Sequence, residues 1–178
     1  MMEDQASPLR SLMKARQSQA PAMPGSMRTL MFLRSPGASP EFAQQFVTAV
    51  RHRMGDGSQG QAAVRVPEPM VSVGSWPEQP ADDIIVHMDS AMGPKQILDW
   101  LSHLSRHPDA KRLWMVVEAP GGLWPARQAA VGQRVLLEQH VGRPVEVLGY
   151  LVGEADTSLY RAAVQQAAFN YIRRVAHG

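Results

Sequence analysis

Short apolar runs alternate with amphipathic segments from Met27 to the end of the chain. Several runs, such as Ile84-Ile85-Val86, contain no polar residue, which is typical of strands buried on both faces of a sheet. We predict five strands on this basis. They are residues 29–33, 62–66, 83–88, 113–118 and 145–151.

Four of the segments between and after these runs repeat apolar residues with the period of a helix. The predicted helices are residues 40–54, 94–107, 125–141 and 157–176. Gly142 and Pro144 supply a stop for the third helix, and Asp156 or Thr157 supplies a cap for the fourth. Strands that alternate with helices in this way predict an α/β fold, in which helices cover both faces of a parallel sheet.

The connection between the second and third strands lacks a predicted helix. Residues 67–82 contain four prolines and show no helical period. A crossover in a parallel sheet normally contains a helix. We therefore expect a proline-rich loop to replace the helix here.

Length and composition narrow the class of protein only a little. The 178 residues fit one domain of residues 27–178, preceded by a flexible tail of residues 1–26. The absence of cysteine excludes disulfides and thiolate ligands. No apolar run reaches the roughly 20 residues of a membrane span, and no signal peptide is evident, so we expect a cytoplasmic protein that does not bind membranes.

Candidate chemistry lies in the loops that follow the strands, because open α/β sheets bind ligands at the carboxyl ends of their strands. After the first strand, Ser35, Ala38 and Ser39 precede a predicted helix. Backbone N–H groups and hydroxyls at such a position can hold a phosphate. An ordinary helix cap explains the same residues equally well, with Ser39 before Pro40 and a negative charge on Glu41 in the first turn.

The segment after the third strand carries a more specific spacing. Pro94, Ile97 and Trp100 match the proline, leucine and tryptophan of a motif found in flavodoxin-like NAD(P)H-dependent oxidoreductases. The Gly121-Gly122 turn and residues 136–147 match the same family in the same order. Over residues 27–176 the sequence thus resembles this family, with its azoreductase/quinone reductase and FMN reductase branches.

This resemblance implies a flavodoxin-like fold, with a five-stranded parallel sheet in the order 2-1-3-4-5, and FMN as cofactor. The FMN phosphate would be held by Ser35, Ala38 and Ser39. Backbone groups of residues 88–91 would line the flavin ring, two glycines would let the backbone approach it, and one tryptophan would add apolar contact. These ring contacts are Met88, Asp89, Ser90, Ala91, Gly121, Gly122 and Trp124.

The resemblance also implies a reaction. NADH or NADPH would reduce the flavin, and the flavin would then reduce a quinone, an azo compound or free flavin. The cofactor performs this chemistry, so the sequence needs no catalytic side chain, and we assign no metal ligand. Enzymes of this family are usually dimers, and we expect a homodimer with Trp76 and Trp124 at its interface.

Departures from the family motif favour an alternative function. Asp89 and Ser90 stand where the family has an aromatic residue and an asparagine, and Glu41 adds a further negative charge. The alternative is a flavodoxin-like module that has lost its flavin and acts as a structural or regulatory protein-interaction domain. Its partner would bind the N-terminal tail or the last helix, which carries Arg161, Arg173 and Arg174. Nucleic acid is a weaker candidate, because few aromatic residues accompany these cations.

Overall fold

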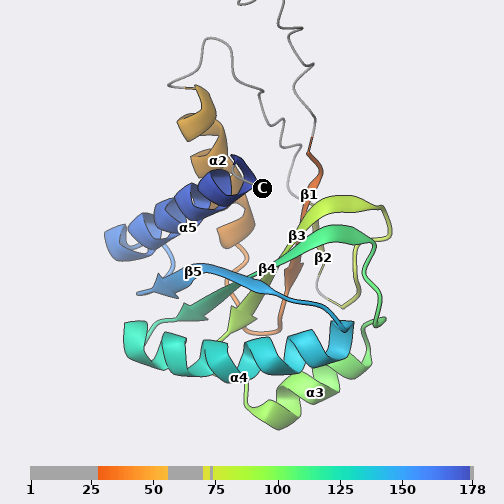
Figure 1. The fold of residues 1–178 in the computed structure, drawn as a ribbon. Coiled ribbons are helices and arrows are strands. Elements are labelled where there is room, and N and C mark those ends of the chain that lie inside the picture. Colours follow the sequence, from red (N-terminus) through yellow and green to blue (C-terminus); the bar gives the residue numbers. More distant parts are fainter. Residues whose placement is uncertain (1–27, 56–69, 73, 177–178) are drawn as a thin grey trace, which may run out of the picture.

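The computed structural model describes residues 28–55, 70–72 and 74–176. Five strands form one parallel sheet in the order β2-β1-β3-β4-β5 (Figure 1). The strands are β1 (Leu30–Arg34), β2 (Met70–Ser72), β3 (Ala81–Asp89), β4 (Ala110–Ala119) and β5 (Glu146–Val152). The predicted α/β fold and its strand order are confirmed.

Helices cover both faces of the sheet in the described part of the chain. They are α2 (Phe42–Gly55), α3 (Pro94–Ser102), α4 (Leu123–Val141) and α5 (Ser158–Ala176). α2 and α5 lie together on one face, and α3 and α4 lie together on the other (Figure 1). The fold is therefore a three-layer, doubly wound α/β sandwich.

Alternate residues of the central strands pack into two separate hydrophobic cores, one on each face of the sheet. Leu30 and Phe32 of β1 pack beneath α2 and α5, while Met31 and Leu33 pack beneath α3 and α4. All four side chains are at most 1% exposed. A strand buried on both faces needs apolar residues at every position, which is why these runs lack polar alternation.

Local sequence fixes several helix ends as predicted. α4 ends at Gly142, which adopts the left-handed conformation with φ of 68°, and α5 is capped by Thr157 Oγ1, which accepts a hydrogen bond from the Tyr160 backbone N–H. α3 is shorter than the predicted 94–107. Its last residue, Ser102, donates its hydroxyl to the carbonyl of Asp99, a side-chain bond that competes with helix continuation.

The second strand differs from the prediction. The edge position beside β1 is taken by β2, which lies within the segment expected to be a loop. The predicted strand at residues 62–66 and the predicted tail at residues 1–26 lie outside the described residues. β2 has only three residues, which is too short for its apolar pattern to distinguish a strand from a loop.

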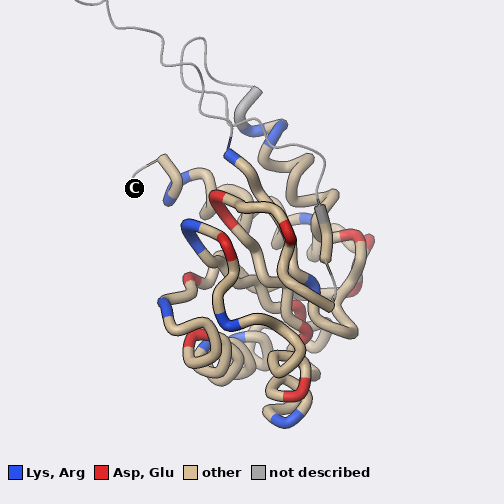
Figure 2. Tube along the Cα trace, turned by 90° about the vertical axis from the view of Figure 1, so that its right-hand side faces the viewer, with Lys and Arg blue, Asp and Glu red and all other residues tan. Residues whose placement is uncertain are grey.

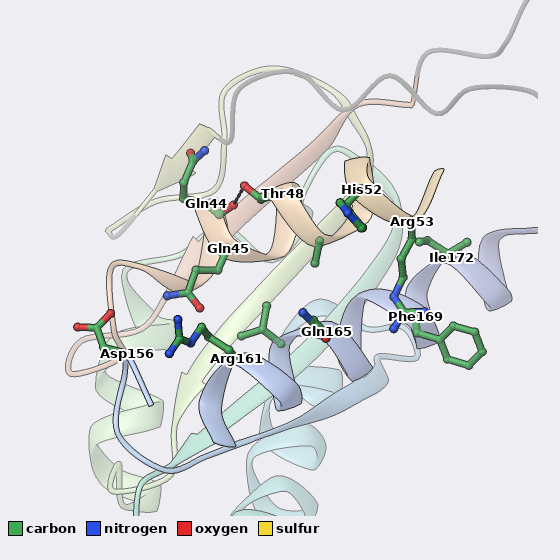
Figure 3. A pocket seen from close by; sticks show the side chains of 12 residues that line it. Gln44, Gln45, Thr48, His52, Arg53, Asp156, Arg161, Gln165, Phe169 and Ile172 are labelled. Atoms are coloured by element: carbon green, nitrogen blue, oxygen red, sulfur yellow. Dashed lines mark hydrogen bonds between the residues drawn. The ribbon is translucent and has the colours of Figure 1, made fainter. Parts of the chain in front are cut away.

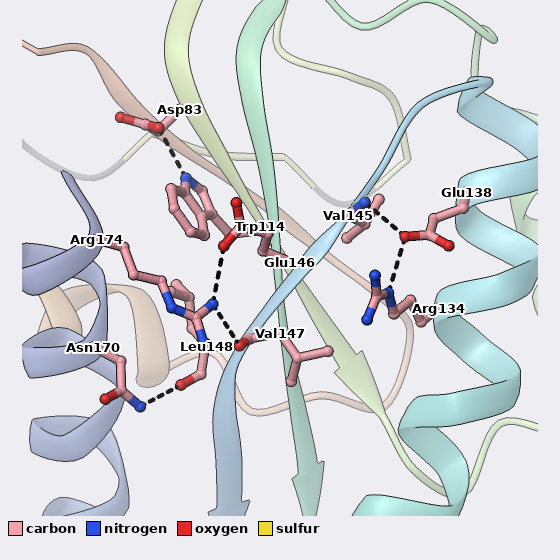
Figure 4. A network of polar contacts seen from close by, with 10 residues as sticks. All are labelled: Asp83, Trp114, Arg134, Glu138, Val145, Glu146, Val147, Leu148, Asn170 and Arg174. Carbon is pink, nitrogen blue, oxygen red and sulfur yellow. Dashed lines mark hydrogen bonds and ion pairs between the residues drawn. The ribbon is translucent and has the colours of Figure 1, made fainter. Parts of the chain in front are cut away.

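The buried carboxylate of Asp83 in β3 connects α5 to the sheet. Asp83 is 0% exposed and accepts three hydrogen bonds, from Trp114 Nε1 at 2.8 Å, Tyr171 Oη at 2.9 Å and Arg28 Nε at 3.0 Å. Figure 4 shows its bond to Trp114. Because Trp114 of β4 and Tyr171 of α5 both donate to this side chain of β3, the three elements are held together at Asp83.

Candidate functional site

The carboxyl ends of β1, β3 and β4 meet at the point where the strand order reverses. The loop after β1 contributes Ser35 and Ser39, β3 contributes His87 and Asp89, and β4 contributes Glu118. The sheet register places Arg34 beside His87 and Asp89 beside Glu118. These polar side chains therefore converge on one end of the sheet, as the alternation of strands and helices predicts.

Glu118 occupies the centre of this site. Its Oε2 accepts the Ser39 backbone N–H at 3.0 Å, its Oε1 accepts the Ser39 hydroxyl, and His87 Nε2 lies 2.7 Å from Oε2. Glu118 is 7% exposed and His87 is 2% exposed. A carboxylate of the protein thus binds the donors just before α2, where a bound anion would otherwise accept them.

The surroundings favour the ionised form of Glu118. Burial alone would raise the pKa of this carboxyl, but the contacts with His87 and Ser39 outweigh burial and lower its pKa below the ordinary value. Nearby, burial and then the charge of Glu118 raise the pKa of Tyr160 above its ordinary value. The centre of the site is therefore the ionised, negatively charged carboxylate of Glu118.

Asp89 fills the other side of the loop after β1. Gly37 has φ of +86°, and a Cβ placed on it would lie 2.3 Å from Asp89 Oδ2. The Ser35 hydroxyl accepts the Asp89 backbone N–H at 2.9 Å, and Asp89 Oδ1 accepts the Ala91 N–H at 2.9 Å. The loop is thus closed around this carboxylate.

Three further residues at the end of β3 and just after it, Met88, Ser90 and Ala91, are predicted to contact the flavin ring. Met88 is fully buried in the core beneath α3 and α4. The Ser90 N–H donates to the Glu118 carbonyl at 2.9 Å, which extends the pairing of β3 and β4. Ala91 is exposed. In this set, only Ser90 and Ala91 lie at the surface near the strand ends.

The predicted residues after β4 are open to solvent. Gly121 is exposed, and a Cβ added there would meet its nearest atom only at 4.0 Å. Gly122 has φ of +116°, so the backbone conformation is what requires glycine at this position. Trp124 is 69% exposed on α4. Trp76, expected at an interface, is instead 7% exposed and donates to the Ser105 carbonyl at 2.6 Å.

Glu118 and His87 organise the site, although neither is among the site residues predicted from the sequence. Glu118 ends the predicted strand 113–118, and His87 lies within the predicted strand 83–88. The signal that could have found them was their position, because each is a polar residue near the carboxyl end of a central buried strand. Glycine at 37 was equally informative, because a left-handed turn requires it.

These residues do not fit the phosphate of FMN. Two of the three residues predicted to hold that phosphate give their donors to the protein itself: the Ala38 N–H donates to the Ser35 carbonyl at 3.3 Å, and the Ser39 N–H and hydroxyl donate to Glu118. The Ser35 hydroxyl accepts the Asp89 N–H. A phosphate would also stand beside two carboxylates, those of Glu118 and Asp89. Displacing Glu118 would leave a buried charge without its partners, which is costly.

The fold and the strand order place the chain in the flavodoxin-like class of α/β proteins. No protein-family model and no curated protein matches the sequence. A short-chain flavodoxin associated with a bacterial microcompartment is similar with a TM-score of 0.50 and 12% identity, over 83% of this chain and 99% of that one.

Two further solved structures are similar over most of their length. A flavodoxin of Streptococcus pneumonia TIGR4 has a TM-score of 0.48 and 13% identity, over 82% of this chain and 99% of that one. An NAD(P)H:quinone oxidoreductase from Methanothermobacter marburgensis has a TM-score of 0.47 and 9% identity, over 81% and 97%. At such low identity these likenesses say nothing of the function of this chain, and its fold follows from the strand order itself.

Two general properties of the described residues bear on function. No described helix is long and apolar enough to span a bilayer. No group of three or more His, Asp or Glu side chains among the described residues is arranged to hold a metal ion.

Proposed function

We propose that the chain is a flavodoxin-like module that holds no flavin and acts by binding a protein partner. The observation that carries this proposal is the contact between Glu118 and Ser39, where the protein's own carboxylate takes both the N–H and the hydroxyl of Ser39. Asp89 fills the adjacent turn at Gly37. The position that a phosphate needs is therefore closed and negatively charged.

The charge distribution supports a binding role. α2 and α5, which cover one face of the sheet, contain five arginines and no acidic residue. A separation of charge of this kind attracts partners of opposite charge and raises their rate of association.

A flavin-dependent oxidoreductase is the second candidate. It is favoured by the resemblance of residues 87–101 to the family motif and by the names of the similar structures, which include flavodoxins and an NAD(P)H:quinone oxidoreductase. On this proposal NADH or NADPH would be the electron donor. It requires Glu118 to leave Ser39 so that FMN can bind there.

An absorption spectrum separates the two candidates. The purified protein is mixed with excess FMN, desalted and measured, with a flavodoxin of known flavin content as the control. We expect no flavin absorption in the desalted protein. Retained flavin bands that bleach with NADH or NADPH would reject the flavin-free proposal and support the oxidoreductase.

A further inference from the structure

A long groove runs between α2 and α5. It has a volume of about 970 Å³ and lies between two helices that contain arginines and no acidic residue (Figure 3). Its lining combines two arginines, a histidine, three glutamines and a phenylalanine. These are Arg53, Arg161, His52, Gln44, Gln45, Gln165 and Phe169.

The two arginines mark opposite ends of the groove. Arg161 lies near Gln45 and Asp156 at one end, and Arg53 lies over the ring of Phe169 at the other, with its guanidinium 5.3 Å from the ring centre (Figure 3). No described side chain forms an ion pair with the Arg161 guanidinium. Asp156 is the one carboxylate among the residues that line the groove.

The spacing of these arginines suits an extended chain. Arg161 and Phe169 are eight positions apart on α5, which corresponds to roughly 12 Å along a helix. Four residues of an extended peptide span about 13 Å, and residues four apart point to the same side. Because the Arg53 guanidinium lies over the ring of Phe169, the same length roughly separates the two arginines. Two acidic side chains four positions apart would therefore reach Arg161 and Arg53 together.

A buried acceptor favours a peptide over a nucleic acid. Gln45 Oε1 is buried and forms no hydrogen bond with a described residue. A peptide backbone can donate an N–H to this oxygen once the Gln45 side chain turns from its buried position toward the groove, whereas the phosphodiester backbone of a nucleic acid has only acceptors. Phe169 is also the only aromatic ring, apart from the imidazole of His52, among the residues that line the groove, so successive bases would find no row of stacking partners.

We propose that the α2–α5 groove binds an extended acidic peptide segment of a partner protein, with carboxylates four residues apart on Arg161 and Arg53 and a backbone N–H on Gln45. The proposal names the partner class for the proposed function. It does not depend on whether the strand-end site is closed, so flavin retention and peptide binding can fail separately.

Peptide titrations test this proposal on the full-length protein. The probe is a fluorescently labelled Gly/Ser peptide with two glutamates four positions apart, and its control has glutamines at those positions. Fluorescence anisotropy at low salt should show tighter binding of the glutamate peptide. Arg161→Ala should weaken it about two- to fivefold, as expected for one exposed ion pair, and Gln45→Met should weaken it as well.

A matched variant and a competitor complete the test. Lys95→Ala removes the same charge from α3 on the other face of the sheet and should leave binding unchanged. Equal affinity for the two peptides, or equal losses in Arg161→Ala and Lys95→Ala, would overturn the proposal. A short single-stranded DNA that binds more tightly and depends on Arg161 would also overturn it, in favour of nucleic acid.

Discussion

Gly37 is the residue on which the turn after β1 depends most directly. Its φ of +86° disfavours any side chain, and an added Cβ would lie 2.3 Å from Asp89 Oδ2. Gly37→Ala should lower the free energy of unfolding by about 1–3 kcal/mol, from backbone strain together with the clash. Urea denaturation measures the change.

Two further variants separate the clash from the strain. Gly142 has φ of +68° in the left-handed region and open space around an added Cβ, so Gly142→Ala reports the strain alone and should cost less. Asp89→Ala combined with Gly37→Ala should lose less stability than the sum of the two single variants. Strict additivity would mean that Asp89 does not fill the turn.

Glu118 should make stability depend on pH in the acid range. Its pKa is lowered in the folded protein, so its contribution is fully present above the unfolded pKa of about 4.3 and is lost as pH falls through the folded value. Glu118→Gln should be less stable than the wild type at neutral pH by about 1–3 kcal/mol. The difference should shrink below pH 4, as measured by denaturation at several pH values. A difference that stays constant down to pH 2 would contradict the role assigned to this carboxylate.

At the scale of elements, α5 is held to the sheet by polar contacts as well as by its apolar face. Asn170 Nδ2 donates to the Leu148 carbonyl at 2.8 Å, and Arg174 Nη1 lies 3.1 Å from Glu146 Oε2 (Figure 4). Tyr171 of the same helix donates to the buried carboxylate of Asp83. These contacts fix the helix that forms one wall of the groove.

Tyr171 and Tyr160 offer a matched pair on α5. Tyr171→Phe removes one of the three donors to Asp83 and should destabilise the protein by about 1–3 kcal/mol. Tyr160 is equally buried, but its hydroxyl forms no hydrogen bond with a described residue, so Tyr160→Phe should be neutral or slightly stabilising. Thermal unfolding of both variants checks this, and equal destabilisation would argue against the Asp83 network.

Elements were predictable from sequence where their signals are local. Gly142 ends α4, and Thr157 caps α5, because these residues act on neighbouring backbone groups. β2 was not predictable, because three residues at a sheet edge gain their strand character from β1. The site was predictable only in part: the strand ends were expected to converge, but the pairing of Ser39 with Glu118 joins residues 79 positions apart.

For the whole molecule, the distribution of charge and the fold indicate different binding surfaces. The strand-end site is the place where this fold binds ligands, yet it holds two carboxylates of its own. The positive charges of α2 and α5 lie on a separate layer. Over the described part of the chain as a whole, charges of both signs are interspersed (Figure 2). The expected homodimer stays a prediction, and Trp124, 69% exposed on α4, is where it would be sought.

We infer that Glu118 takes the place of a bound phosphate, and the backbone amide of Ser39 is the group that reports on this exchange. We would follow the ¹H–¹⁵N resonance of this amide by NMR while FMN is added at neutral pH, and separately while the pH is lowered. We expect no shift with FMN, and a shift as Glu118 becomes protonated in acid. A shift that saturates at one FMN per chain would show that FMN displaces Glu118 from Ser39, and it would rule out the closed site.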